Sequence, residues 1–462
     1  MKHWIRIFTG TLLLALLICC LSACSMPGAD MGAPEETKKP GGLFAPEPTE
    51  PPILLGGAEI APDAQELTLN AGTFTLQELQ EARERLPQLT RLSLPETDLT
   101  LREIQKLRRS GLTVDYTVTL AGQTVPGDAK ELDLSALKPK DLTQTAEKLT
   151  MLPALTDVEL MSAAGKSSLS KQDVRTLMDA APAARFHYEF DLFGQHLSTL
   201  DTRVVYDSVE IGNEGVPEVR EAMDIMTDCE YFLLDSCGID NEHMAQLRDE
   251  HPEMKVVWRV FFKDCNLRTD AHVVRVTFEL NDSNCTPLKY CTEAVYVDLG
   301  HNDKMTDCSY LAYMPNLECI ILSGAAIKDI TPFANCKNLI WVELVFCGRI
   351  ESIEVFRDHP TMKYLNISRT YISDISMLDN VPLERFNCMA PVSQYAQRHF
   401  KETHPNCIAV YYGVQPYGYG WRYNDSGYTF FDYYQHMRDV FHYDETEYFG
   451  SHKGVHEDDE IV

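Results

Sequence analysis

Apolar positions recur with a fixed period in the second half of the chain. The pattern LxxLxL, with apolar residues at its first, fourth and sixth positions, starts at Ala294, Leu317, Leu339, Met362 and Leu383, 21 to 23 residues apart. Apolar residues at three-residue spacing follow each of the first four copies, as at positions 327, 330 and 333. The alternation predicts a short strand with one buried face, and the three-residue spacing predicts a turn or short helix. Such a period predicts coils that stack into one continuous core.

This pattern resembles the leucine-rich repeat. The segments Ile-Lys-Asp-Ile-Thr-Pro-Phe at 327–333 and Ile-Ser-Asp-Ile-Ser-Met-Leu at 372–378 resemble its internalin-type subclass. The resemblance implies an α/β fold, a leucine-rich-repeat solenoid with parallel strands on the concave face and helices or turns on the convex face. It also implies a binding role, and it names no ligand. We assign residues 291–412 to regular repeats, including one more coil at 389–412.

Residues 57–290 contain a longer and more degenerate repeat. Units begin near Leu67, Leu132, Val209 and Val276. We interpret each unit as about three coils whose third strand overruns the solenoid, with turns at residues 121–122 and 193–194. A separate α/β domain that precedes the repeats is the alternative.

The N-terminal residues predict export and a lipid anchor. Lys2 and Arg6 precede a short apolar run, and Leu-Ser-Ala-Cys at 21–24 resembles the bacterial lipoprotein box. The resemblance implies that residues 1–23 are a lipoprotein signal peptide and that Cys24 is lipidated. An ordinary secretory leader is the alternative. Residues 24–56 are Pro-rich and predict a disordered tether. The expected location is the extracytoplasmic face of a bacterial cell membrane.

The C-terminal residues 413–462 are rich in aromatic side chains and then in acidic ones. We expect a cap over the open core of the last coil, followed by a frayed acidic tail. The alternative is an aromatic binding patch.

The net charge and the lack of recognisable catalytic motifs limit the classes of function that we expect. A formal net charge of −28 argues against nucleic acid, which needs a basic surface. No catalytic motif is recognisable, so we predict a binding protein without enzymatic activity, cofactor or metal site. His436, His442, His452 and His456 match no zinc spacing and are expected to be solvated. The cysteines after Cys24 are expected to be mostly free thiols, because several occupy core positions of the repeats.

The predicted binding surface is the concave face of the regular repeats. The third and fifth residues of LxxLxL point away from the core, because side chains alternate along a strand. The candidate ligand-binding residues at these positions are Tyr296, Trp341, Tyr364, Arg385, Glu343 and Asn366. We expect them to be exposed and to contact a protein, peptide or glycan, since Tyr, Trp and Arg dominate many interfaces. The alternative is that the rings merely pack on one another. The alternative functions are a structural or accessory scaffold of the envelope and an unrecognised hydrolase.

Overall fold

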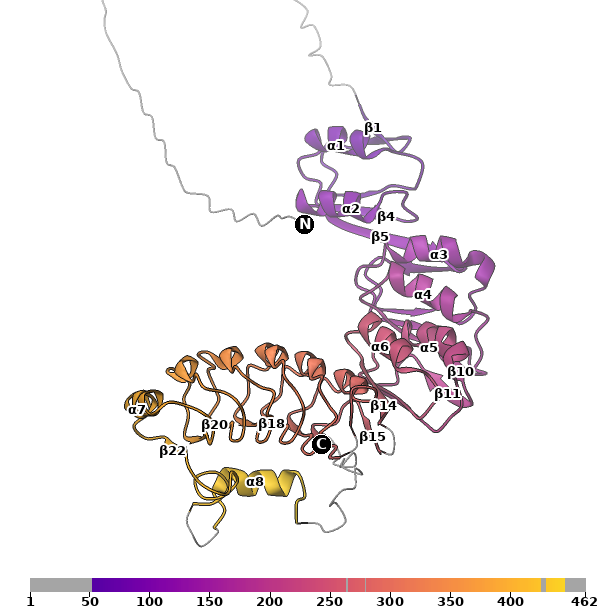
Figure 1. Cartoon of the computed structure of the whole chain (residues 1–462). Coiled ribbons are helices and arrows are strands. Elements are labelled where there is room, and N and C mark those ends of the chain that lie inside the picture. Colours follow the sequence, from indigo (N-terminus) through magenta and orange to yellow (C-terminus); the bar gives the residue numbers. More distant parts are fainter. Residues whose placement is uncertain (1–51, 263–264, 279, 425–428, 445–462) are drawn as a thin grey trace, which may run out of the picture. The chain divides into compact units, whose positions relative to one another are not determined.

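The computed structural model describes residues 52–262, 265–278, 280–424 and 429–444. The predicted leader, Cys24, most of the tether and the acidic tail lie outside these residues. The described elements, drawn in colour in Figure 1, all belong to the unit of the chain that begins at Ile53.

The chain first forms three degenerate units, each with three parallel strands, two helices and a closing hairpin strand. A short hairpin of β1 (Ile53–Leu55) and β2 (Ala58–Ile60) precedes them. The first unit contains β3 (Glu66–Thr68), α1 (Leu76–Glu84), β4 (Arg91–Leu94), α2 (Leu101–Arg109), β5 (Thr113–Leu120) and β6 (Gln123–Pro126). The second contains β7 (Glu131–Asp133), η1 (Pro139–Asp141), α3 (Leu142–Leu149), β8 (Asp157–Glu159), α4 (Lys171–Ala180), β9 (Arg185–His187), β10 (Glu189–Leu192) and β11 (Gln195–Ser198). The third contains β12 (Arg203–Asp207), η2 (Asn213–Gly215), α5 (Val216–Met223), β13 (Tyr231–Asp235), α6 (Asn241–Glu250), β14 (Lys255–Phe262) and β15 (Cys265–Arg268).

Local sequence signals explain where these elements begin and end. Thr75, Thr100 and Ser170 each cap a helix and form a capping box with the acidic residue three positions later. The turns predicted at residues 121–122 and 193–194 are present: all four residues have positive φ, which suits a two-residue hairpin. The strand before each turn therefore runs past its parallel neighbour and folds back.

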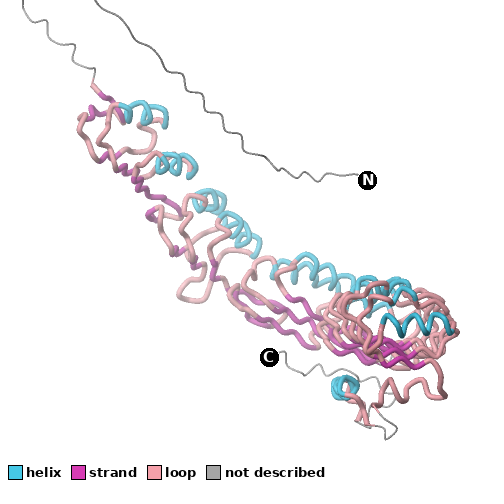
Figure 2. Tube along the Cα trace, turned by 90° about the vertical axis from the view of Figure 1, so that its left-hand side faces the viewer, coloured by secondary structure: helices cyan, strands magenta, loops and turns pink. Residues whose placement is uncertain are grey.

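The regular repeats form a seven-stranded parallel sheet. Its strands, in sequence order, are β16 (Val273–Arg275), β17 (Tyr296–Asp298), β18 (Cys319–Ile321), β19 (Trp341–Glu343), β20 (Tyr364–Asn366), β21 (Arg385–Asn387) and β22 (Ile408–Val410). The convex side carries the short 3₁₀ helices η3 (Thr286–Tyr290), η4 (Ser309–Tyr313), η5 (Thr331–Asn335), η6 (Glu354–Phe356) and η7 (Ser376–Leu378), and then α7 (Gln394–Thr403). Figure 2 shows strands on one side of the coils and helices on the other. After η7, α7 leads to β22, which pairs in parallel with β21, and the chain continues to α8 (Asp432–Val440).

One cluster of buried side chains runs from Ile53 to Phe400, through the degenerate units and the regular repeats. The predicted core residues Leu322, Leu344 and Ile367 are fully buried in it. Buried Cys308 takes the place that Ile330 and Ile353 fill in later coils, as its repeat position predicted. The core therefore continues from coil to coil without a break, as stacked repeats require.

Candidate functional site

The concave face of the regular repeats carries two continuous rows of side chains. The third-position row pairs Tyr296, Cys319, Trp341, Tyr364 and Arg385 directly across neighbouring strands. The fifth-position row pairs Asp298, Ile321, Glu343, Asn366 and Asn387 in the same way. The predicted register of the repeats is confirmed.

The prediction that these side chains are exposed is wrong for most of them. Trp341 and Asn366 are 0% exposed, Glu343 is 1% exposed, and Tyr364 and Arg385 are below a tenth. Tyr296 is half-buried. A segment from the chain's own C-terminus lies on this face, and we call its described part, residues 413–424 and 429–444, the C-terminal cover. Side-chain direction was predicted correctly, but what lies opposite the sheet was not.

The C-terminal cover packs its aromatic residues onto the third-position row. The ring centroids of Trp341 and Trp421 are 4.0 Å apart, and Phe431 and Tyr434 stack on Trp341 at about 6 Å. The guanidinium of Arg385 lies 3.8 Å from the ring centre of Phe431. The rings of Trp341, Trp421 and Phe431 belong to a second hydrophobic cluster, separate from the core of the coils. The expected position of the segment, over the open core of the last coil, is therefore corrected: its rings cover the concave face.

Polar residues of the fifth-position row hold the cover in place. Trp421 Nε1 donates to Glu343 Oε2 at 2.6 Å, and Ser323 Oγ donates to the other carboxylate oxygen at 2.9 Å. Arg422 Nη2 lies 3.4 Å from the same carboxylate. Asn366 donates to the carbonyl oxygen of Pro416 at 2.9 Å. A buried carboxylate with these partners is satisfied, which explains how Glu343 tolerates burial.

A cavity of about 390 Å³ remains between the cover and strands β16 to β19. Its charged and aromatic lining includes Arg275, Asp298, Glu343, Tyr417, Arg422 and Arg438. Tyr443 donates to Asp298 at 2.6 Å, and burial raises the pKa of its hydroxyl, so that it stays protonated. The cover residues were not among the predicted ligand-binding residues, although the alternative of an aromatic binding patch included Tyr417 and Tyr443. The sequence did contain an indication of this contact: the repeats carry a polar and acidic row, and the aromatic C-terminal segment contains arginines that could pair with it.

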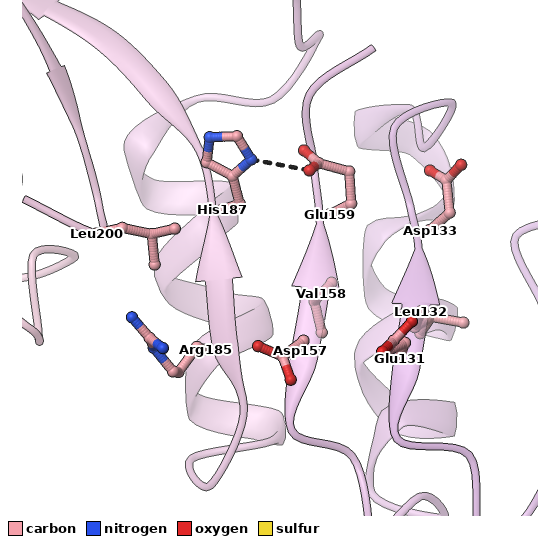
Figure 3. A pocket seen from close by; sticks show the side chains of 9 residues that line it. All are labelled: Glu131, Leu132, Asp133, Asp157, Val158, Glu159, Arg185, His187 and Leu200. Atoms are coloured by element: carbon pink, nitrogen blue, oxygen red, sulfur yellow. Dashed lines mark hydrogen bonds and ion pairs between the residues drawn. The ribbon is translucent and has the colours of Figure 1, made fainter. Parts of the chain in front are cut away.

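A second hollow, of about 450 Å³, lies on the strands of the second degenerate unit. Figure 3 shows its charged side chains on three adjacent strands: Glu131 and Asp133 on β7, Asp157 and Glu159 on β8, and Arg185 and His187 on β9. His187 Nδ1 lies 2.8 Å from Glu159, and this hydrogen bond raises the pKa of the imidazole. Sequence reasoning missed this site. The sequence feature that could have indicated it is a core residue with an acidic residue on each side, as in Glu-Leu-Asp at 131–133 and Asp-Val-Glu at 157–159.

Among the described ranges, no group of three or more His, Cys, Asp or Glu side chains is placed to hold a metal ion. No helix in that part of the chain is both long and apolar enough to cross a membrane. His452 and His456 lie outside it.

Parallel strands at a repeat of 21 to 23 residues, a continuous core and helical turns on the convex side define a leucine-rich-repeat solenoid. No family model matches the sequence, and no curated protein matches it. Similar solved structures include an internalin of Listeria monocytogenes, InlF, at 16% identity over 75% of this chain and 79% of that chain, with a TM-score of 0.27. A leucine-rich-repeat protein of Leptospira interrogans is 14% identical over 75% of this chain and 89% of that one, with a TM-score of 0.25. These values are low, and the assignment rests on the repeat geometry of the chain itself.

Proposed function

We propose that this protein is a lipid-anchored binding protein on the extracytoplasmic face of a bacterial membrane, and that the hollow over β7 to β9 binds a cationic segment of a protein partner. The proposed anchor is Cys24, on the strength of the residues at 21–24. Leucine-rich-repeat solenoids are binding scaffolds, because stacked strands present an extended surface at little cost to the core. The proposal rests on one observation: the strand surface of the second degenerate unit is open.

The concave face of the regular repeats is occupied by the C-terminal cover, whereas the strand surface of the second degenerate unit is not. The side chains of Glu131, Asp133 and Asp157 are exposed there. The hollow brings together four carboxylates and two basic groups. Such an acidic depression attracts a basic segment and speeds its association.

The two basic groups of the hollow already have partners. Arg185 pairs with Asp228 at 2.8 Å, and His187 pairs with Glu159. By contrast, among the described residues neither Glu131 nor Asp157 forms a salt bridge, although Arg185 lies opposite Asp157 on the neighbouring strand. Their charges are therefore available to lysine or arginine side chains of a partner.

Fluorescence anisotropy tests this surface. The purified protein is titrated into labelled peptides rich in Lys and Arg and into matched peptides rich in Asp and Glu. We expect binding of the basic set only, with affinity that falls as salt rises. Removing two exposed charges, each worth about 0.2–1 kcal/mol, costs between about twofold and roughly thirtyfold in affinity. The variant is Glu131→Gln with Asp157→Asn.

The matched control is Glu84→Gln with Glu147→Gln, which removes two exposed charges from helices α1 and α3. We expect it to bind the basic peptides like the unmodified protein. Equal losses in the two double variants would show that only net charge matters, and binding of acidic peptides would contradict the proposal directly.

A further inference from the structure

We propose that the cavity beneath the C-terminal cover is a second binding site, for a small ligand in which a carboxylate is attached to a ring. This site is distinct from the acidic hollow over β7 to β9 and does not depend on it. One wall is built by the strands of the regular repeats and the other by the C-terminal cover.

The size and lining of the cavity suit a small molecule. Its volume of about 390 Å³ lies near the lower end of the roughly 300–1,000 Å³ typical of ligand sites. Charged side chains converge there although they are buried: Arg275 is 9% exposed and Asp298 is 6% exposed. A cavity with few but convergent polar groups and aromatic walls is the usual architecture of a ligand site. A cavity of this volume holds a molecule with a single ring and a small substituent.

The two carboxylates of the cavity already accept hydrogen bonds from other groups of the protein. Glu343 accepts from Trp421, Ser323 and Arg422. Asp298 accepts from the hydroxyl of Tyr443 and from the backbone N–H of Gly300, at 2.6 and 2.9 Å. Another donor from a ligand would compete with these bonds. The carboxylates therefore give no reason to expect a hydrogen-bond donor on the ligand.

The arginines of the cover keep spare donors. Arg422 reaches Glu343 through Nη2 only at 3.4 Å, and its side chain is 29% exposed. Arg438 pairs with Asp444 through one Nη, and its side chain is 17% exposed. Within the described residues the buried Nε atoms of both arginines have no hydrogen-bond partner. A guanidinium carries five N–H donors in a planar fork that matches a carboxylate, so the missing group in this cavity is an anionic acceptor.

The entrance of the cavity supplies the ring selectivity. Phe278 and His301 line the cavity and stack with ring centroids 4.7 Å apart and planes 10° apart. Phe278 is 54% exposed and has φ 70°, the left-handed turn conformation that His301 and Phe346 adopt at the same place in later coils. The flat ring of an aromatic acid, or the apolar C–H face of a sugar acid, extends this stack.

Titration calorimetry with defined compounds tests the site. The purified full chain is titrated with sodium glucuronate and sodium benzoate, and with glucose and benzamide as neutral counterparts. We expect at least one acid to bind, and its neutral counterpart to bind at least tenfold more weakly. Which acid binds distinguishes a sugar acid from an aromatic acid. Equal binding of acid and neutral compound, or no binding of either acid by both the full chain and a chain that ends at residue 444, would overturn the proposal.

Two variants and a control locate the binding. We expect Arg438→Gln to weaken acid binding at least tenfold, whereas Arg357→Gln, an exposed arginine paired with Glu354 beside η6, leaves it unchanged. Phe278→Ser reports on the entrance without touching a cover arginine, and we expect it to weaken binding several-fold while the preference for the acid persists. Unchanged affinity in both cavity variants would overturn the assignment.

The acidic residues at 445–462 offer carboxylates of their own, so the same titrations are run on a chain that ends at residue 444. Tighter binding by the shortened chain would support the site and identify those residues as a competitor. Absence of binding in both chains would refute it.

Discussion

Replacing Glu343 with alanine is the sharpest perturbation of the contact between the repeats and the C-terminal cover. The side chain is 1% exposed and accepts hydrogen bonds from Trp421 and Ser323, with Arg422 also in contact. The substitution leaves the indole N–H and the guanidinium without their carboxylate. Breaking a buried ion pair by removing one partner costs about 3–5 kcal/mol. Because Arg422 keeps partial access to water, we expect the lower end, about 3 kcal/mol.

This loss concerns the docking of the cover more than the coils, because two of the partners of Glu343 belong to the cover. About 3 kcal/mol corresponds to roughly a hundredfold rise in the population of the detached cover. Hydrogen exchange followed by mass spectrometry measures it, since amide exchange reports local opening. Amides of α8 should exchange roughly a hundredfold faster in Glu343→Ala, while those of β17 and η4 should change far less.

Two variants control this result. Glu351→Ala removes an exposed glutamate from the same coil and should leave exchange in α8 unchanged. Glu343→Gln keeps an acceptor for Trp421 but loses the charge that faces Arg422, so we expect an intermediate effect of about 1–2 kcal/mol. Identical exchange in Glu343→Ala and Glu351→Ala would mean that the cover is not held by this carboxylate, and the packing argument would be wrong.

Other expectations follow from burial, proton binding and the proposed anchor. Leu344→Ala should lower the free energy of unfolding by about 2–5 kcal/mol in urea denaturation, because it removes a fully buried side chain; no change would contradict the register of the coils. The pKa of His187 should lie above 6.5 by NMR titration and fall in Glu159→Gln, so the pair stabilises the fold below about pH 6.5 and loses this contribution as pH rises through the folded pKa. Burial raises the pKa of Cys336 to about 12, so thiol reagents at pH 8 should label it only after denaturation. Cys24→Ala should abolish incorporation of a tagged fatty acid, and equal label on both proteins would refute the anchor.

The periodic part of the fold could be predicted from the sequence. The LxxLxL pattern correctly placed Leu322, Leu344 and Ile367 in the core and aligned Tyr296 with Trp341 in one row. These features are local, because the alternation of side chains along a strand and the contacts between adjacent coils repeat every 21 to 23 residues. A short stretch of sequence therefore contains all the information they need.

The accessibility of the concave face could not be predicted in this way. The pattern states that Trp341 and Glu343 point away from the core, and an isolated coil would expose both. Their burial depends on Trp421 and Phe431, which belong to no repeat and lie far along the chain. The same holds for the acidic hollow, where residues of β7, β8 and β9 meet only because the strands stack. Periodicity determines which way a side chain faces. Its burial and the chemistry of the site depend on which other segment or strand packs beside it. Only the tertiary structure contains that contact.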